Sequence, residues 1–138
     1  MEPQTTRQSA LVLARGRAVI GLVALTFPGL LNRAWLGAGA ATPHAKALAR
    51  MLGVRDLVLG VGALTSVKEQ TQGPEWLSMG AIADGVDALV ALTMPGAPRR
   101  TRLLSLFAGG AALVTLKVAR DLADERARTA SSPLEPGA

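Results

Sequence analysis

Trp76–Met94 reads WLSMGAIADGVDALVALTM, and Asp84 and Asp87 are its only charged residues. Further along the chain, Leu103–Leu116 reads LLSLFAGGAALVTL and carries no charge. A helix on the surface of a soluble protein shows water a polar stripe along one side. Neither stretch has enough polar residues for such a stripe, so both are predicted to be helices in a membrane.

The composition of the whole chain agrees with this prediction. Apolar residues make up 49% of the 138 residues, charged residues only 18%, and the mean hydropathy is +0.31, whereas about 25% of a typical soluble domain is charged. A chain of this length forms one domain. Cysteine is absent and His44 is the single histidine, which excludes disulfides, thiolate chemistry and histidine-rich metal sites. We expect no metal and no cofactor.

Four apolar segments are separated by linkers that contain proline or glycine. We expect helices at Ser9–Leu31, Ala45–Val67, Trp76–Met94 and Leu103–Val118. The predicted fold is all-α, an integral membrane four-helix bundle formed by residues 1–128. Its last helix is expected to continue into the cytoplasm to residue 128, and residues 129–138 are expected to form a disordered tail. A soluble helical bundle is the alternative.

Local signals mark where these helices begin and end. Pro28 is expected to end or kink the first helix, because proline lacks the amide donor that a helix needs. The Gly/Ala-rich stretch Asn32–Ala41 is predicted to be a loop. Thr42 precedes a proline, a pair typical of a helix N-cap, and Thr101 is a candidate cap for the last helix.

The basic residues indicate membrane lipids as partners. The net charge is +5 and the pI about 11.1, but the cations flank the apolar segments and form no stripe with aromatic residues, so nucleic acid is not expected. Eight lie on the side of the two termini: Arg7, Arg15, Arg17, Lys68, Lys117, Arg120, Arg126 and Arg128. Six lie on the other side: Arg33, Lys46, Arg50, Arg99, Arg100 and Arg102. This bias favours both termini in the cytoplasm, with the first helix retained and not cleaved as a signal.

Two short stretches of the chain are nearly identical. Leu22–Gly29 reads LVALTFPG and Leu89–Gly96 reads LVALTMPG, so that Arg17 corresponds to Asp84 and Arg33 to Arg100. The match is consistent with two helical hairpins related by a pseudo-twofold axis along the membrane normal. Independent convergence on the same helix-ending residues explains it equally well.

Five charged residues fall near the middle of the predicted helices: Arg17, Arg55, Asp56, Asp84 and Asp87. The rise per residue of an α-helix places these five residues at similar depths, in one central layer of the bundle. The two aspartates of the third helix are three residues apart and therefore share a face. A charge at the bilayer centre costs at least about 2.5–3.5 kcal/mol and normally finds a partner inside the bundle. We therefore predict a buried network of these five residues, which Lys117 or Arg50 could complete.

The role of this network stays open at the level of sequence. It could hold the helices in register, or bind a lipophilic ligand or a partner helix. A membrane-embedded isomerase or cyclase with Asp84 or Asp87 as its acid/base residue is an alternative, and an oligomeric proton-coupled transporter is another. The leading interpretation is a non-enzymatic membrane component that binds a lipophilic ligand or a partner helix and that can form homo-oligomers.

One set of motifs extends over most of the chain, between Ala14 and Ala119: Arg15-Gly16-Arg17-x-x-x-Gly21, then Pro28, then Leu52-Gly53-Val54-Arg55-Asp56-Leu57-x-Leu59-Gly60, then Asp84-x-x-Asp87-Ala88. This arrangement resembles a large group of small, uncharacterised four-helix membrane proteins of actinobacteria, which are loosely similar to the DoxX-like group. The resemblance implies a four-helix bundle in the bacterial plasma membrane. It implies no assigned reaction and no catalytic residue.

Overall fold

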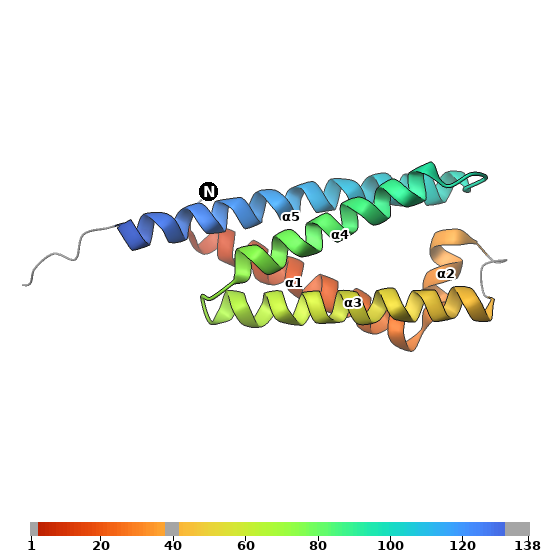
Figure 1. Ribbon diagram of the computed structural model, residues 1–138, viewed down its shortest axis with the longest axis horizontal. Coiled ribbons are helices and arrows are strands. Elements are labelled where there is room, and N and C mark those ends of the chain that lie inside the picture. Colours follow the sequence, from red (N-terminus) through yellow and green to blue (C-terminus); the bar gives the residue numbers. More distant parts are fainter. Residues whose placement is uncertain (1–2, 38–41, 132–138) are drawn as a thin grey trace, which may run out of the picture.

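The computed structural model describes residues 3–37 and 42–131, and within these ranges all regular structure is helical. The helices are α1 (Pro3–Thr26), α2 (Pro28–Leu36), α3 (Pro43–Lys68), α4 (Gly73–Thr93) and α5 (Arg99–Ser131). The predicted all-α class is thus confirmed. The long helices form two pairs, because α1 packs most extensively on α3 and α4 on α5 (Figure 1).

The first predicted helix is in fact two helices. Phe27 has a non-helical backbone (φ −124°, ψ 55°) and separates α1 from α2, because the proline that follows it disfavours a helical conformation at the preceding residue. The expected break at Pro28 is thus confirmed, and the helix predicted over residues 9–31 is divided between α1 and α2. Asn32–Leu36, predicted as the start of a loop, belongs to α2, whereas residues 38–41 lie outside the described ranges.

The other helix ends agree with the sequence to different degrees. Thr42 caps α3 as predicted, since its side-chain oxygen accepts a hydrogen bond from the amide of Ala45 at 3.2 Å. Thr101 is not a cap, because α5 begins two residues earlier at Arg99. The helix also includes residues 129–131, which were predicted to begin the tail, and residues 132–138 lie outside the described part of the chain.

Small residues bring α1 and α3 into close contact. A Cβ atom placed on Gly21 would lie 2.7 Å from the carbonyl oxygen of Gly53, and one placed on Gly60 would lie 2.5 Å from the amide nitrogen of Ala18. No side chain fits at these distances, so the two backbones pack directly against each other. Such close approach is the usual basis of helix packing in membranes.

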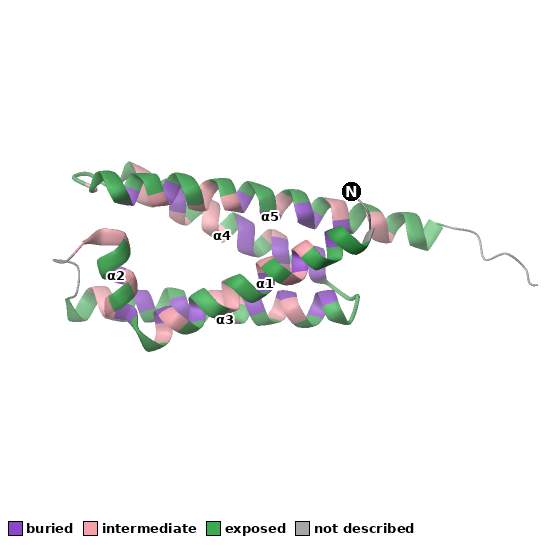
Figure 2. Cartoon of the chain, turned by 180° about the vertical axis from the view of Figure 1, so that it is seen from behind, coloured by how far each residue is buried: buried purple, intermediate pink, exposed green. Residues whose placement is uncertain are grey.

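The hydrophobic core lies toward the end of the molecule that holds the turn between α3 and α4. Its buried members come from all four long helices: Ala10, Ala14, Ala63, Val67, Leu77, Val118, Ala119 and Leu122. The two pairs come together at this end and diverge toward the end that carries α2 (Figure 1). Buried residues lie on the facing sides of the helices and exposed residues on the outer sides (Figure 2).

Three helices are long and apolar enough to cross a membrane: α4, α5 and the Gln4–Thr26 portion of α1. Every 18-residue window of α3 contains Arg55 and Asp56 together with Arg50 or Lys68, so α3 is outside this set. Large apolar side chains cover the outer surface, and Leu113 and Phe107 are among the most exposed. Such a surface suits hydrocarbon and not water.

Buried positions in α1 and α4 recur at the same spacing as the repeated sequence. Arg17 and Asp84 are 67 residues apart, and the same offset relates buried residues of α1 to buried residues of α4. The pairs are Thr6 and Gly73, Ala10 and Leu77, Ala14 and Ala81, and Gly21 and Ala88. The two helices therefore bury equivalent faces.

Candidate functional site: a charged network at mid-helix

The five predicted residues form one continuous chain of ion pairs. Asp56 lies at its centre, 3.2 Å from Nη1 of Arg17 and 3.1 Å from Nη2 of Arg55 through the same Oδ1 atom. Arg17 continues the chain to Asp84, and Arg55 continues it to Asp87, with 2.5 Å between Nη2 and Oδ2. Carboxylates and guanidinium groups thus alternate along the network, and the prediction that these residues meet is confirmed.

Three helices contribute to the network at about the middle of their lengths. Arg17 comes from α1, Arg55 and Asp56 come from α3, and Asp84 and Asp87 come from α4. Asp84 and Asp87 are one helical turn apart, which lets each reach a different arginine. The network therefore links the α1–α3 pair to α4 of the second pair.

Gly80 provides the space for Arg17 and was not singled out from the sequence. A Cβ atom on Gly80 would lie 2.9 Å from Cζ of Arg17, so the guanidinium group lies directly on the backbone of α4. Gly80 precedes Asp84 by four residues, and positions so spaced share a helix face. This spacing was the available signal, because a glycine on the same helix face as an aspartate near the middle of an apolar helix leaves room for the partner of that aspartate.

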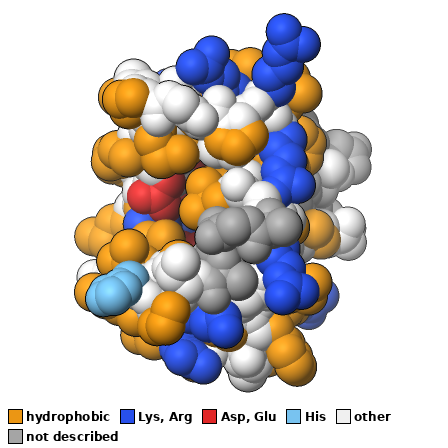
Figure 3. Space-filling view, turned by 90° about the vertical axis from the view of Figure 1, so that its right-hand side faces the viewer, with side chains coloured by type: hydrophobic (Ala, Val, Ile, Leu, Met, Phe, Trp, Pro, Cys, Tyr) orange, Lys and Arg blue, Asp and Glu red, His pale blue; other side chains and the backbone are white. Residues whose placement is uncertain are grey.

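Arg17 and Asp56 are the least exposed members of the network, and Asp87 is the most exposed. The side chains of Arg17 and Asp56 are 13% and 17% exposed, whereas those of Asp84, Arg55 and Asp87 are 28%, 32% and 43% exposed. Viewed from the α2 end, acidic side chains lie within a hollow bordered by hydrophobic ones (Figure 3). The network is therefore enclosed on one side and open on the other.

The residues proposed to complete the network lie outside it. Lys117 is 72% exposed and pairs with Asp121, one turn further along α5, at 2.7 Å. Arg50 lines a separate groove between α1, α2 and α3. Both expectations were wrong, since a shared depth along the helices does not place residues on the same face. The network thus has two guanidinium groups and three carboxylates, a formal charge of −1 when all are ionised.

Two hydrogen bonds from α5 tie the short helix α2 to the rest of the protein. The hydroxyl of Thr101, which is fully buried, donates to the carbonyl oxygen of Trp35 at 2.7 Å. Nη2 of Arg100 donates to the carbonyl oxygen of Arg33 at 2.7 Å. These bonds satisfy carbonyl groups of α2 and hold it against the start of α5.

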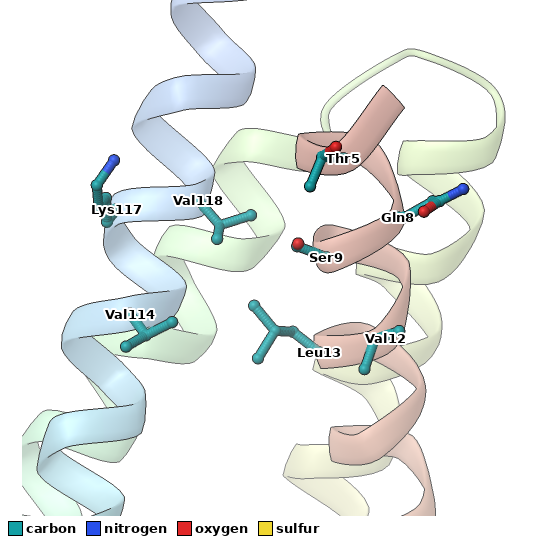
Figure 4. Close-up of a pocket in the computed structure, with 8 residues that line it drawn as sticks. All are labelled: Thr5, Gln8, Ser9, Val12, Leu13, Val114, Lys117 and Val118. Atoms are coloured by element: carbon teal, nitrogen blue, oxygen red, sulfur yellow. The ribbon is translucent and has the colours of Figure 1, made fainter. Parts of the chain in front are cut away.

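One hollow on the surface of the protein lies away from the charges. It is a groove of about 610 Å³ between the first half of α1 and the middle of α5. Leu13, Val114 and Val118 project into it from the two helices, and Ser9 and Thr5 lie along its α1 side (Figure 4). No residue of the charged network lines this groove or the smaller one beside α2. A molecule that reaches the network would therefore approach its open side.

No family model, curated protein or solved structure matches this chain. Within residues 3–37 and 42–131, no group of three or more His, Asp or Glu side chains could hold a metal ion. What the site can do thus follows from its ion pairs, its open side and the helices that carry it.

Proposed function

We propose that this chain is a multi-pass membrane protein whose charged network binds the polar group of a lipophilic ligand. In the proposal α1, α3, α4 and α5 all span the bilayer as a four-helix bundle. Three of them are apolar enough by composition alone. The charges that set α3 apart, Arg55 and Asp56, are paired with α1 and α4, and pairing inside a bundle lowers the cost of placing charges in a membrane.

The observation that supports a binding role is the open side of the network. Asp87 is 43% exposed and pairs with one residue of the described part of the chain, Arg55. A network that served only to hold helices together would be expected to bury its charges. A partly exposed carboxylate at the depth of the hydrocarbon is costly, so a molecule that covers it with a hydrogen-bond donor or a cation would be stabilised there.

The charge of the network indicates which ligand fits. Three carboxylates face two guanidinium groups, so the excess charge is negative and the ligand's polar group should be a cation or a strong donor. A second copy of the chain on the same face would bring another negative network to it, which like-charge repulsion disfavours. Homo-oligomers, if they form, should therefore use another face.

The test compares two amphiphiles that share a dodecyl chain and differ in the head group, which is a cation in one and neutral in the other. Dodecylammonium should raise the melting temperature of the detergent-purified protein more than dodecanol does, because a ligand that binds the folded state stabilises it. Asp87→Asn should abolish the difference by making the network neutral. Asp124→Asn is the matched control, because it removes an exposed carboxylate of α5 that belongs to no ion pair in the described residues. Equal responses of wild type and Asp87→Asn would refute the proposal.

The equivalent buried faces of α1 and α4 support the two-hairpin arrangement as part of this proposal. In it, α1 with α3 and α4 with α5 descend from one duplicated hairpin. Arg17 and Asp84 occupy equivalent positions and pair with each other. Equivalent residues meet in this way where they lie next to a pseudo-twofold axis.

The proposal places the chain in a bacterial plasma membrane with both termini in the cytoplasm. Arg17 belongs to the network and is therefore no longer counted among the flanking cations. Seven flanking cations then lie on the side of the two termini and six on the other side. Because the chain has no cysteine, single cysteines can report the orientation. Pro95→Cys should react with a membrane-impermeant maleimide on intact cells, and Gln72→Cys should react only after lysis. The reverse pattern would invert the assigned orientation.

A further inference from the structure

A second groove lies beside α2, at the end of the molecule opposite the hydrophobic core. It has a volume of about 380 Å³ and is lined by the end of α1, the first turns of α2 and the start of α3. Three of its lining residues are cations, Arg33, Lys46 and Arg50, and none is acidic. Phe27 and Leu30, both well exposed, supply its apolar rim.

The three cations stand apart from the carboxylates of the described residues. None of them takes part in an ion pair within the described residues. Lys46 lies over the start of α2, since a Cβ atom on Gly29 would lie 3.5 Å from its Cε. Their charge is therefore available to a ligand, in contrast to the arginines of the mid-helix network.

The surroundings increase the positive potential of this groove. The first turns of α2, α3 and α5 contain no acidic residue, and α5 begins with three arginines among four residues. The same end of the molecule shows several basic patches (Figure 3). The N-terminus of α2 also lines this groove and has no side-chain cap. Such a helix end favours a nearby anion.

The level of the groove along the helices indicates where that anion comes from. The candidate span in α1 has 23 residues, and at about 1.5 Å per residue it is long enough to cross a hydrocarbon core of about 30 Å. Its last residue, Thr26, lines the groove, which puts the groove at the level of the lipid head groups. Phosphate oxygens and acyl chains meet at that level, as the cations and the apolar rim do here.

We infer that this groove binds the phosphate of an anionic phospholipid, with Arg33, Lys46 and Arg50 on the phosphate and Phe27 and Leu30 against the first part of the acyl chains. The inference rests on the chain spanning the bilayer and is independent of the ligand proposed for the network.

Native mass spectrometry of the protein in micelles with equal phosphatidylglycerol and phosphatidylcholine tests the assignment. The wild type should retain phosphatidylglycerol preferentially, and each cation removed should weaken that preference about fivefold. The double variant Arg33→Gln/Arg50→Gln should therefore lose it. The control Arg99→Gln/Arg102→Gln removes the same charge from the same end but outside the groove, and should retain it.

Lys46→Gln and Lys46→Arg separate a lost site from a damaged fold. The first should weaken phosphatidylglycerol retention and the second should restore it, with unchanged melting temperatures in phosphatidylcholine. Equal losses of phosphatidylglycerol retention in the two double variants would mean that the positive charge of this whole end of the protein, and not the groove, attracts the lipid. That result would overturn the inference. Inorganic phosphate that competes as well as phosphatidylglycerol would also overturn it, because the site would then recognise a free anion. Failure of the dodecylammonium test on Asp87→Asn would leave this inference intact.

Discussion

Arg17 connects α1 to both α3 and α4 through its side chain. Its guanidinium group contacts two carboxylates from different helices, Asp56 and Asp84, and lies on the backbone of Gly80. A side chain held at three points has little freedom to move aside. Any atom added at Gly80 must therefore displace Arg17 or push the helices apart.

Gly80→Ala is accordingly expected to destabilise the protein by about 1–3 kcal/mol, the usual cost of overpacking, although alanine is the better helix former. Gly85→Ala on the same helix is the control, because a Cβ atom there meets nothing within 4 Å, and it should be neutral or slightly stabilising. Thermal unfolding in detergent measures both. Equal melting temperatures for the two variants would show that Arg17 is free to move.

At the scale of elements, α2 shows what sequence patterns leave out. The break at Pro28 follows from the chemistry of proline, and the Thr42 cap follows from an equally local rule, so both could be predicted. That residues 32–36 remain helical depends on Thr101 and Arg100, which bond to α2 from 66 and 67 residues away. A short stretch of sequence contains no sign of contacts with residues so far along the chain. The Gly/Ala-rich composition of the stretch that follows therefore led to the prediction of a loop.

Removing one of these contacts should loosen α2 alone. Thr101→Val deletes the hydroxyl that donates to Trp35, at a cost of about 1 kcal/mol. Amide hydrogens of residues 28–36 should then exchange faster, with the long helices unaffected. Thr93→Val is the control, since its exposed hydroxyl bonds only within α4, to Leu89 and Val90. Unchanged exchange in α2 after Thr101→Val would mean that other contacts hold it.

At the scale of the whole molecule, two helix pairs share a hydrophobic core at one end and a charged network at mid-length. The five residues that form the network could be predicted, because charges in apolar helices are few and helix rise fixes their depth. The order of its pairs could not, since it depends on how the helices are rotated. Because the sequence does not show how each helix is rotated about its axis, Lys117 and Arg50 were incorrectly included. For the same reason the exposure of Asp87 could not be predicted.

In the proposed arrangement the network holds three helices together at its centre, and its outer end is free to bind a ligand. Comparing the melting temperatures of Asp56→Asn and Asp87→Asn in one detergent tests it most directly. Asp56 accepts from both arginines and is 17% exposed, so its loss should cost about 3 kcal/mol or more. Asp87 is 43% exposed, and its loss should cost about 1 kcal/mol or less. Equal destabilisation by the two variants, or a larger effect of Asp87→Asn, would show instead that the outer end of the network holds the helices as strongly as its centre does.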